Sequence, residues 1–220
     1  ADRIVALPDI RSGGQQGSGQ PNDEIWSTST DNQIVTLYDV NGFGATMVSN
    51  TYADGKGVMK FDSPVTSIGD MAFAGYSTLL SLAIPASVDT IGAYVFRGSS
   101  NLASIGVDPD NTAYDSRNDC NAIIESATNK LIAGCNNTVI PYGVTSIGDY
   151  AFFYCNNLSS VVSKIQSPFT ISENVFASSW ETTQNGVTTW PKSSATLYVP
   201  NDSKASYETT KGWNMFADII

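Results

Sequence analysis

Apolar residues return at a fixed interval through the middle of the chain. Residues 65–73, Val-Thr-Ser-Ile-Gly-Asp-Met-Ala-Phe, recur in modified form at 88–96 and at 144–152, and a weaker copy follows at 171–176. Corresponding residues of the first two copies are 23 positions apart. Self-similarity at such a period indicates a repeat architecture in which each copy is one small structural unit.

Each unit has the pattern of one short strand followed by a turn. Leu82 and Ile84 are two positions apart, so they point to the same face of a strand, and Pro85 ends that strand because proline has no N–H to donate. Ile91 and Phe96 return to the interior after the turn. One unit buries too few apolar side chains to compensate for ordering its own backbone. We therefore predict that the units stack, with parallel strands about 4.8 Å apart.

One repeat is longer than the others. The interval from Ile91 to Ile147 is 56 residues, which is 23 plus 33, so this repeat carries about ten extra residues. The insert, at about 108–138, contains two strand-like runs on either side of the polar turn 126–129. Insertions within a single repeat usually form a loop or hairpin on one face of the stack. The repeat region as a whole is predicted to span 65–200.

The two ends differ from the repeats. Residues 1–22 are rich in Gly and Gln and are predicted to be a flexible leader. Residues 23–64 are predicted to form an N-terminal β cap with two hairpins, one from 25 to 38 and one from 48 to 61. Residues 201–220 combine helix start and stop residues with apolar side chains, which is typical of a C-terminal cap.

The unit L-x-x-L-x-I-P-x-x-V-x-x-I-G-x-x-A-F-x-x-C resembles the BspA-like, or Treponema-type, leucine-rich repeats of bacterial surface proteins. The likeness covers roughly 65–200, and 144–155 fit it closely, with Cys155 at the last position. Ser87 stands where common leucine-rich repeats have Asn, so we expect no Asn ladder. The resemblance implies a leucine-rich-repeat solenoid of the α/β type, with mostly short parallel strands, short helical turns, an N-terminal β-hairpin cap and a short helical C-terminal cap.

Composition and charge narrow the possible partners. Hydrophobic residues make up 41% of the 220 residues, charged residues only 15%, and the net charge is -10. Such a balance repels phosphate backbones and anionic lipid surfaces, so we expect no nucleic-acid partner. No stretch approaches the roughly 20 apolar residues of a membrane span. The chain begins at Ala1 without a Met, and we expect that a signal or lipidation segment preceded it. The resemblance to BspA-like repeats implies that the protein is secreted or displayed at the cell surface.

Residue types that carry chemistry are scarce. Histidine is absent, which removes the commonest general base and most zinc sites. Four carboxylates lie near the insert, and turn formation explains them better than glycoside chemistry or a surface cation site: Asp108, Asp110, Asp115 and Asp119. The three cysteines, which read as buried small hydrophobes or as one disulfide and one free thiol, are Cys120, Cys135 and Cys155. We expect no catalytic residue, no cofactor and no metal.

Two surfaces are candidates for a partner. Trp180 and Trp190 flank a polar loop, where they are suited either to grip a sugar ring or a protein or to fill the space where the fourth repeat loses its register. The second candidate is a strip of small side chains on alternate strand positions, with one tyrosine at its end: Ser81, Ala83, Ser104, Gly106, Ser160, Val162 and Tyr198.

These features favour a non-enzymatic repeat protein that binds a protein or a glycan, as adhesins do. The alternative is a structural spacer or assembly module without a specific ligand, since repeat stacks are stiff and extendable. A glycoside-active enzyme is a remote third hypothesis, which would require Asp115 or Asp119 to act in turnover. Family resemblance alone does not identify a site.

Overall fold

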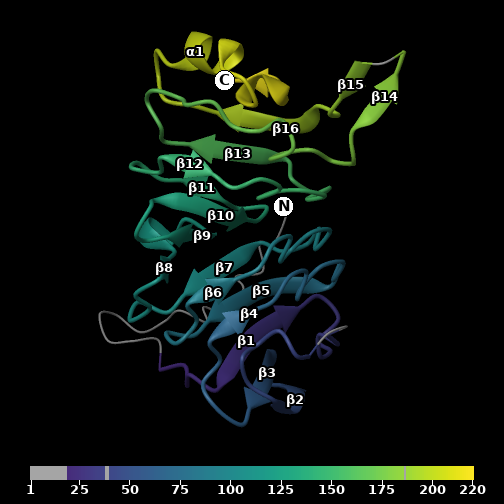
Figure 1. Cartoon of the computed structure of the whole chain (residues 1–220), viewed down its shortest axis with the longest axis vertical. Helices are drawn as coiled ribbons and strands as arrows, with labels where there is room; N and C mark the ends of the chain where they lie inside the picture. Colours follow the sequence, from purple (N-terminus) through teal and green to yellow (C-terminus); the bar gives the residue numbers. More distant parts are fainter. Residues whose placement is uncertain (1–18, 38–39, 186) are drawn as a thin grey trace, which may run out of the picture.

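The computed structural model describes residues 19–37, 40–185 and 187–220. These residues form seventeen mostly short strands, one α-helix and two short 3-10 turns. The strands follow one another along the long axis of the molecule, from β1–β3 at one end to α1 at the other (Figure 1). Within the described ranges, no helix has the length and apolar character needed to cross a bilayer. Of the predicted leader, residues 1–18 lie outside the described residues.

The first sheet joins the N-terminal strands to the first repeats. β1 (Glu24–Ser29) lies antiparallel between β3 (Lys56–Phe61) and β5 (Leu79–Ile84), and β2 (Met47–Ala53) pairs with the other edge of β3. β7 (Ser104–Val107) pairs in parallel with β5, and each residue lies beside the one 23 positions later. Successive repeats therefore pair at the interval predicted from the sequence.

Shorter strands show the same register. β4 (Ser67–Ile68) pairs in parallel with β6 (Thr90–Ile91), so that Ile68 lies beside Ile91. The segments that follow these strands are turns, although helical turns were predicted. Met71 and its counterpart Tyr94 have positive φ values of 54° and 55°, and left-handed residues of this kind interrupt a right-handed helix.

The insert forms a sheet of its own. Its strands are β8 (Tyr114–Asp115), β9 (Ala122–Glu125) and β10 (Lys130–Gly134), with the 3-10 turn η1 (Arg117–Asp119) between the first two. β9 pairs antiparallel with β8 and β10, which confirms the two strand-like runs predicted around 126–129. β12 (Ser146–Ile147) then pairs in parallel with β10.

The remaining repeats make a third sheet, and all its strands are parallel. In order across the sheet, its members are β11 (Val139–Ile140), β13 (Ser160–Ser163), β16 (Ser193–Tyr198) and β17 (Phe216–Ile219). Between β13 and β16 the chain makes an exposed antiparallel hairpin of β14 (Thr182–Gln184) and β15 (Val187–Thr189). This hairpin projects sideways from the body of the molecule (Figure 1).

The C-terminal residues cover the end of this sheet. α1 (Lys204–Thr209) and the 3-10 turn η2 (Trp213–Met215) bury Tyr207 and Trp213, whose rings meet edge to face with centroids 5.0 Å apart. Tyr207 also donates a hydrogen bond to the carbonyl of Ile165, and the Trp213 indole donates to the carbonyl of Phe169.

Two apolar cores lie along the molecule, and the insert separates them. Ile123 packs into the core that the N-terminal strands share with the first repeats, whereas Ala122 and Ile124 pack into the core of the C-terminal repeats. All three lie on β9, whose side chains alternate between its two faces. β9 therefore lies between the two cores and contributes side chains to both of them.

Two predictions need correction. The hairpin from 25 to 38 is absent among the described residues, because both edges of β1 are already paired with β3 and β5, and residues 33–37 are not a strand. The single parallel array is also too simple. The first sheet and the sheet of the insert each combine parallel and antiparallel pairs, and Ile147 lies beside Leu131 of the insert instead of continuing the row of Ile68 and Ile91.

Candidate functional site

The turn segments that follow the Ile-Gly pairs are joined by their backbones. In the first repeat, the N–H groups of Met71, Phe73 and Gly75 donate to carbonyls of the next repeat, those of Ala93, Val95 and Arg97, at 2.7–2.9 Å. In the last repeats, Phe152 and Tyr154 donate to Val175 and Ala177 in the same way. Each turn segment is thus normally covered by the segment of the following repeat.

The long third repeat interrupts this ladder. Its Tyr114 stands 23 residues after Ile91, and the Tyr114 hydroxyl accepts the Ile91 N–H at 3.1 Å. Beyond that residue the chain turns away into β8 and η1. The turn is held by Arg117, which forms an ion pair with Asp115 at 2.5 Å. Among the residues that the structure describes, no turn segment of the third repeat therefore covers residues 92–98.

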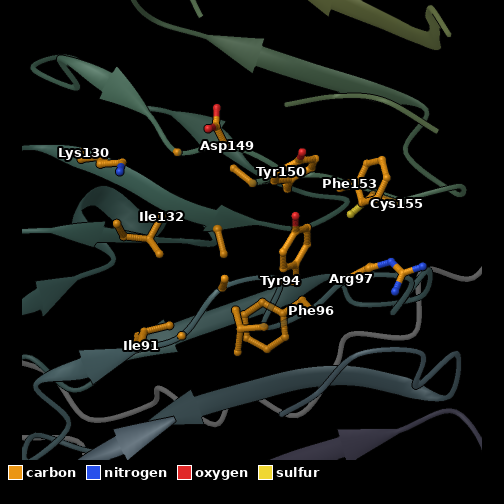
Figure 2. A pocket seen from close by; sticks show the side chains of 16 residues that line it. Ile91, Tyr94, Phe96, Arg97, Lys130, Ile132, Asp149, Tyr150, Phe153 and Cys155 are labelled. Atoms are coloured by element: carbon orange, nitrogen blue, oxygen red, sulfur yellow. The ribbon is translucent and has the colours of Figure 1, made fainter. Parts of the chain in front are cut away.

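A pocket of about 430 Å³ opens at this interruption. One wall is the turn segment after Ile91, the other is the segment after Gly148, and the floor carries Lys130, Ile132 and Ala133 of the insert. The volume lies in the range of about 300–1,000 Å³ that small ligands and short chain segments occupy. Figure 2 shows Tyr94 between the two walls, with Lys130 and Asp149 toward one end and Arg97, Phe153 and Cys155 toward the other.

Aromatic rings gather at the pocket. Tyr94 and Tyr150, from opposite walls, have ring centroids 4.6 Å apart. The ring centroid of Trp180 lies 4.7 Å from that of Phe153, 5.9 Å from that of Tyr150 and 6.4 Å from that of Tyr94. The ring centroids of Trp190 and Tyr150 are 6.1 Å apart. Trp180 remains 43% exposed. Rings that are partly packed and partly open present flat apolar surface to a partner at little cost in conformational entropy.

Two cations line the pocket without a carboxylate partner in the described part of the chain. The Arg97 guanidinium lies 5.1 Å from the Tyr154 ring and 5.5 Å from the Trp180 ring. Its Nε is buried and makes no hydrogen bond within that same part of the chain. Lys130 lines the opposite end and has no ion pair among the described residues. Buried guanidinium donors normally have acceptors, so Arg97 is suited to receive one.

The carboxylates near the insert serve the chain itself. Asp115 accepts hydrogen bonds from Arg117 and from the Ser126 hydroxyl. Burial alone would raise the pKa of Asp115, but the hydrogen bonds and charge of Arg117 outweigh it, and the pKa is lowered. Asp108 accepts the Asp110 N–H in a local turn. For Asp108 and Asp115, these local hydrogen bonds agree with the predicted turn role.

Of the two alternatives for the cysteines, the structure shows the one without a disulfide, because all three side chains are thiols. Cys120 is buried and Cys155 half-buried, both as free thiols, and burial raises their pKa values to about 11 and about 12. The Cys135 thiol is buried and contacts the carbonyl of Asn121 at 3.2 Å. Thiols with such raised pKa values are poor nucleophiles.

The predicted strip of small side chains is only partly accessible. Ser81 and Ala83 are 3% and 7% exposed, and Ser81 shares a hydrogen bond with Thr28 of β1 at 2.5 Å. Ser104 is half-buried and Gly106 is buried beside them on β7. At the other end, Ser160 and Val162 are half-buried, and Tyr198, paired with Val162, is 44% exposed. Tyr198 is therefore the one exposed member of the strip, Ser104, Ser160 and Val162 are partly accessible, and Ser81, Ala83 and Gly106 are buried.

Trp180 and Trp190 do come together beside the pocket, with ring centroids 6.4 Å apart, but the residues that line the pocket were not predicted from the sequence. Tyr94, Tyr150 and Arg97 are dispersed in the sequence and sit at ordinary repeat positions. The signal was nevertheless present, because the long repeat lacks the Ile-Gly-x-x-x-Phe segment that covers its neighbour elsewhere.

Comparison with known proteins agrees with the repeat pattern. Residues 122–190 match the model of the family described as BspA type leucine rich repeat region (6 copies). This match confirms the resemblance over a stretch shorter than half the chain, and the first two copies lie outside it. No curated protein and no solved structure shows significant similarity.

Proposed function

Because this chain carries a BspA-type leucine-rich repeat region, we propose that it is a non-enzymatic binding protein, secreted or displayed at a cell surface, whose partner is a protein or a glycan. The observation that supports this most is the pocket at the interrupted repeat. It combines partly open aromatic rings with an Arg97 guanidinium whose Nε has no acceptor in the described chain. Interfaces draw much of their affinity from Trp, Tyr and Arg in such settings.

The proposal includes a solenoid between two caps. In-register pairing of β4 with β6 and of β5 with β7 supports the stack, and the antiparallel β1–β3 strands and the α1–η2 segment cover its ends. Residues 23–64, 65–200 and 201–220 are the corresponding proposed units. Terminal units of this kind shield the apolar ends of a repeat stack from solvent.

Catalysis is not part of the proposal. The sequence contains no histidine, and Asp115, one of the carboxylates of the insert, is engaged by Arg117 and Ser126. A glycosidase would instead need two carboxylates facing one substrate bond. The Asp115→Asn variant should therefore change stability and not reveal a lost activity.

The proposal is tested by screening the full chain against immobilised extracellular matrix proteins and a glycan array. We expect saturable binding to at least one class, and weaker binding by the Arg97→Gln variant. Blank results in both screens would overturn the binding function. In that case light scattering tests the spacer alternative, which is favoured if the chain forms oligomers that grow with concentration.

A further inference from the structure

We propose that the pocket binds an extended peptide segment of a partner protein, which takes the place that a third turn segment would occupy in the ladder. The inference rests on the proposed binding function and specifies the site and the class of ligand. It follows from the backbone groups on the two walls of the pocket.

The turn segment after Ile91 has a row of backbone N–H donors without a partner among the described residues. In the part of the chain that the structure describes, the N–H groups of Tyr94, Phe96 and Gly98 make no hydrogen bond. Their counterparts 23 residues earlier all donate to the following repeat. Phe96 is only 4% exposed. A buried N–H without a partner is rare and costs free energy comparable to a lost hydrogen bond, so this row is suited to bind acceptors.

The opposite wall, formed by the segment after Gly148, has backbone carbonyls that can accept hydrogen bonds. Within the described ranges, the carbonyls of Asp149 and Phe153 receive no hydrogen bond, whereas the carbonyl of Ala151 between them accepts the Gly134 N–H at 3.0 Å. The equivalent carbonyls of the second repeat, those of Ala93 and Arg97, each receive an N–H from the first repeat. Tyr94 and Phe96, which line one side of the pocket, therefore offer main-chain donors, with the Gly98 donor just beyond the lining, and Asp149 and Phe153 offer main-chain acceptors on the other side.

This pattern fits a peptide better than a sugar. The donors occur at every second residue, which is the spacing at which an extended chain presents its carbonyls to one side. Peptide recognition by strand addition uses this complementarity for affinity and uses side-chain contacts for specificity. Arg97 supplies the side-chain contact, because its guanidinium matches a carboxylate and lacks one within the described residues. The segment should therefore carry an acidic side chain.

The test uses synthetic peptides with the sequences of residues 65–73, 88–96 and 144–152, each with a scrambled control, added to the full ¹⁵N-labelled chain. In the free protein, we expect the amides of Tyr94, Phe96 and Gly98 to exchange about 100-fold faster than the paired amides at the equivalent positions of the first repeat. At saturation with at least one acidic repeat peptide, exchange of the three amides should slow by about 10-fold or more.

A matched pair of variants separates binding from folding. Tyr94→Gly and Met71→Gly replace residues at the same repeat position, both with positive φ, where glycine is well tolerated. Only Tyr94 lines the pocket. We expect Tyr94→Gly to weaken peptide binding by about 5-fold or more, as loss of aromatic contacts does, and Met71→Gly to leave it unchanged. Arg97→Gln should remove the preference for a peptide with Asp over the same peptide with Asn.

Several results would overturn the peptide site. These are slow exchange of the three amides in the free chain, no slowing by any repeat peptide, or equal effects of the two glycine variants. Binding of a glycan with unchanged amide exchange would identify a sugar site instead. A screening partner that binds the Tyr94→Gly variant as tightly as the unmodified chain would leave the proposed function standing and remove this site alone.

Discussion

Tyr94 and Tyr150 show how one repeat position acquires a new role. Both have positive φ, as Met71 does at the same position of the first repeat. The left-handed turn is thus shared by the three clear copies of the repeat, and each of them accepts its cost of about 1 kcal/mol for a residue other than glycine, whereas Asn174 of the weaker copy is not left-handed. Only at the interruption do two such side chains face one another, because no segment lies between them.

The glycines of two Ile-Gly pairs, Gly92 and Gly148, differ in how closely a neighbouring segment packs against them. A Cβ added at Gly92 would overlap the backbone nitrogen of Asp70 in the preceding repeat, whereas one added at Gly148 would have its nearest neighbour, a Leu131 carbonyl oxygen, at 3.4 Å. Gly92→Ala should therefore destabilise the fold by about 1–3 kcal/mol, and Gly148→Ala by less than about 0.5 kcal/mol. Urea denaturation measures both, and equal losses would contradict the different packing of the two repeats.

Phe96 closes the second repeat and packs 6.0 Å from Phe73, the residue that closes the first. Phe96→Ala should lower the free energy of unfolding by about 3–5 kcal/mol, because it leaves a cavity in a row of stacked rings. Tyr142→Ala, at a side chain that is 69% exposed, serves as the control and should cost less than about 0.5 kcal/mol. A loss below about 1 kcal/mol for Phe96→Ala in a denaturant melt would show that this ring is not part of the core.

At the scale of elements, the two hairpins of the chain play opposite roles. β9 and β10 of the insert are largely buried and contribute side chains to both cores, so they hold the two halves of the stack together. β14 and β15 are exposed at every described position and project from the body. Length and strand pattern alone do not distinguish such hairpins, because the difference lies in what packs against them.

Replacing residues 182–189 by a short Gly-Ser linker, with Trp180 and Trp190 retained, should change the free energy of unfolding by less than about 1 kcal/mol, since these strands bury little. The Ile124→Ala variant in β9 should cost about 2–5 kcal/mol, because Ile124 is fully buried. Thermal and denaturant melts of both proteins check the contrast. If the hairpin replacement lowers the free energy of unfolding as much as Ile124→Ala does, β14 and β15 contribute to the stability of the fold.

At the scale of the whole molecule, several buried groups bind their protons more tightly than the same groups in an unfolded chain. Burial raises the pKa of Cys120 to about 11 and also raises the pKa of Tyr114 and Tyr207. Each group loses its proton at lower pH in the unfolded chain than in the folded one. Their contribution to stability is therefore fully present below the unfolded pKa, about 8.5 for a thiol, and is lost as the pH rises above it.

We therefore expect the urea midpoint to stay nearly level with respect to these groups from pH 7 to 8 and to fall between pH 9 and 11. Each thiol contributes at most about 1.4 kcal/mol per pH unit in that window. The Cys120→Ala variant should show a shallower fall, whatever its stability at pH 7. Parallel pH profiles for the two proteins would mean that Cys120 does not titrate differently on unfolding.

The sequence by itself determined the repeat, its 23-residue register, the position of the long repeat and the antiparallel pair inside it. These follow from the spacing of apolar residues, which must meet their counterparts in the next unit to leave water. It also identified Trp180 and Trp190, although not their neighbours.

Only the tertiary structure decided where β1 pairs, how the insert divides the core and where the backbone ladder is left open. Pairing of β1 depends on competition between distant strand edges, and spacing along the chain carries no information about which edge is free. Tyr94, Arg97 and Tyr150 became neighbours because a segment that the repeat normally places between them turns away at Tyr114. A pattern read along one chain records which residues are present, whereas a site also depends on which expected contact is missing.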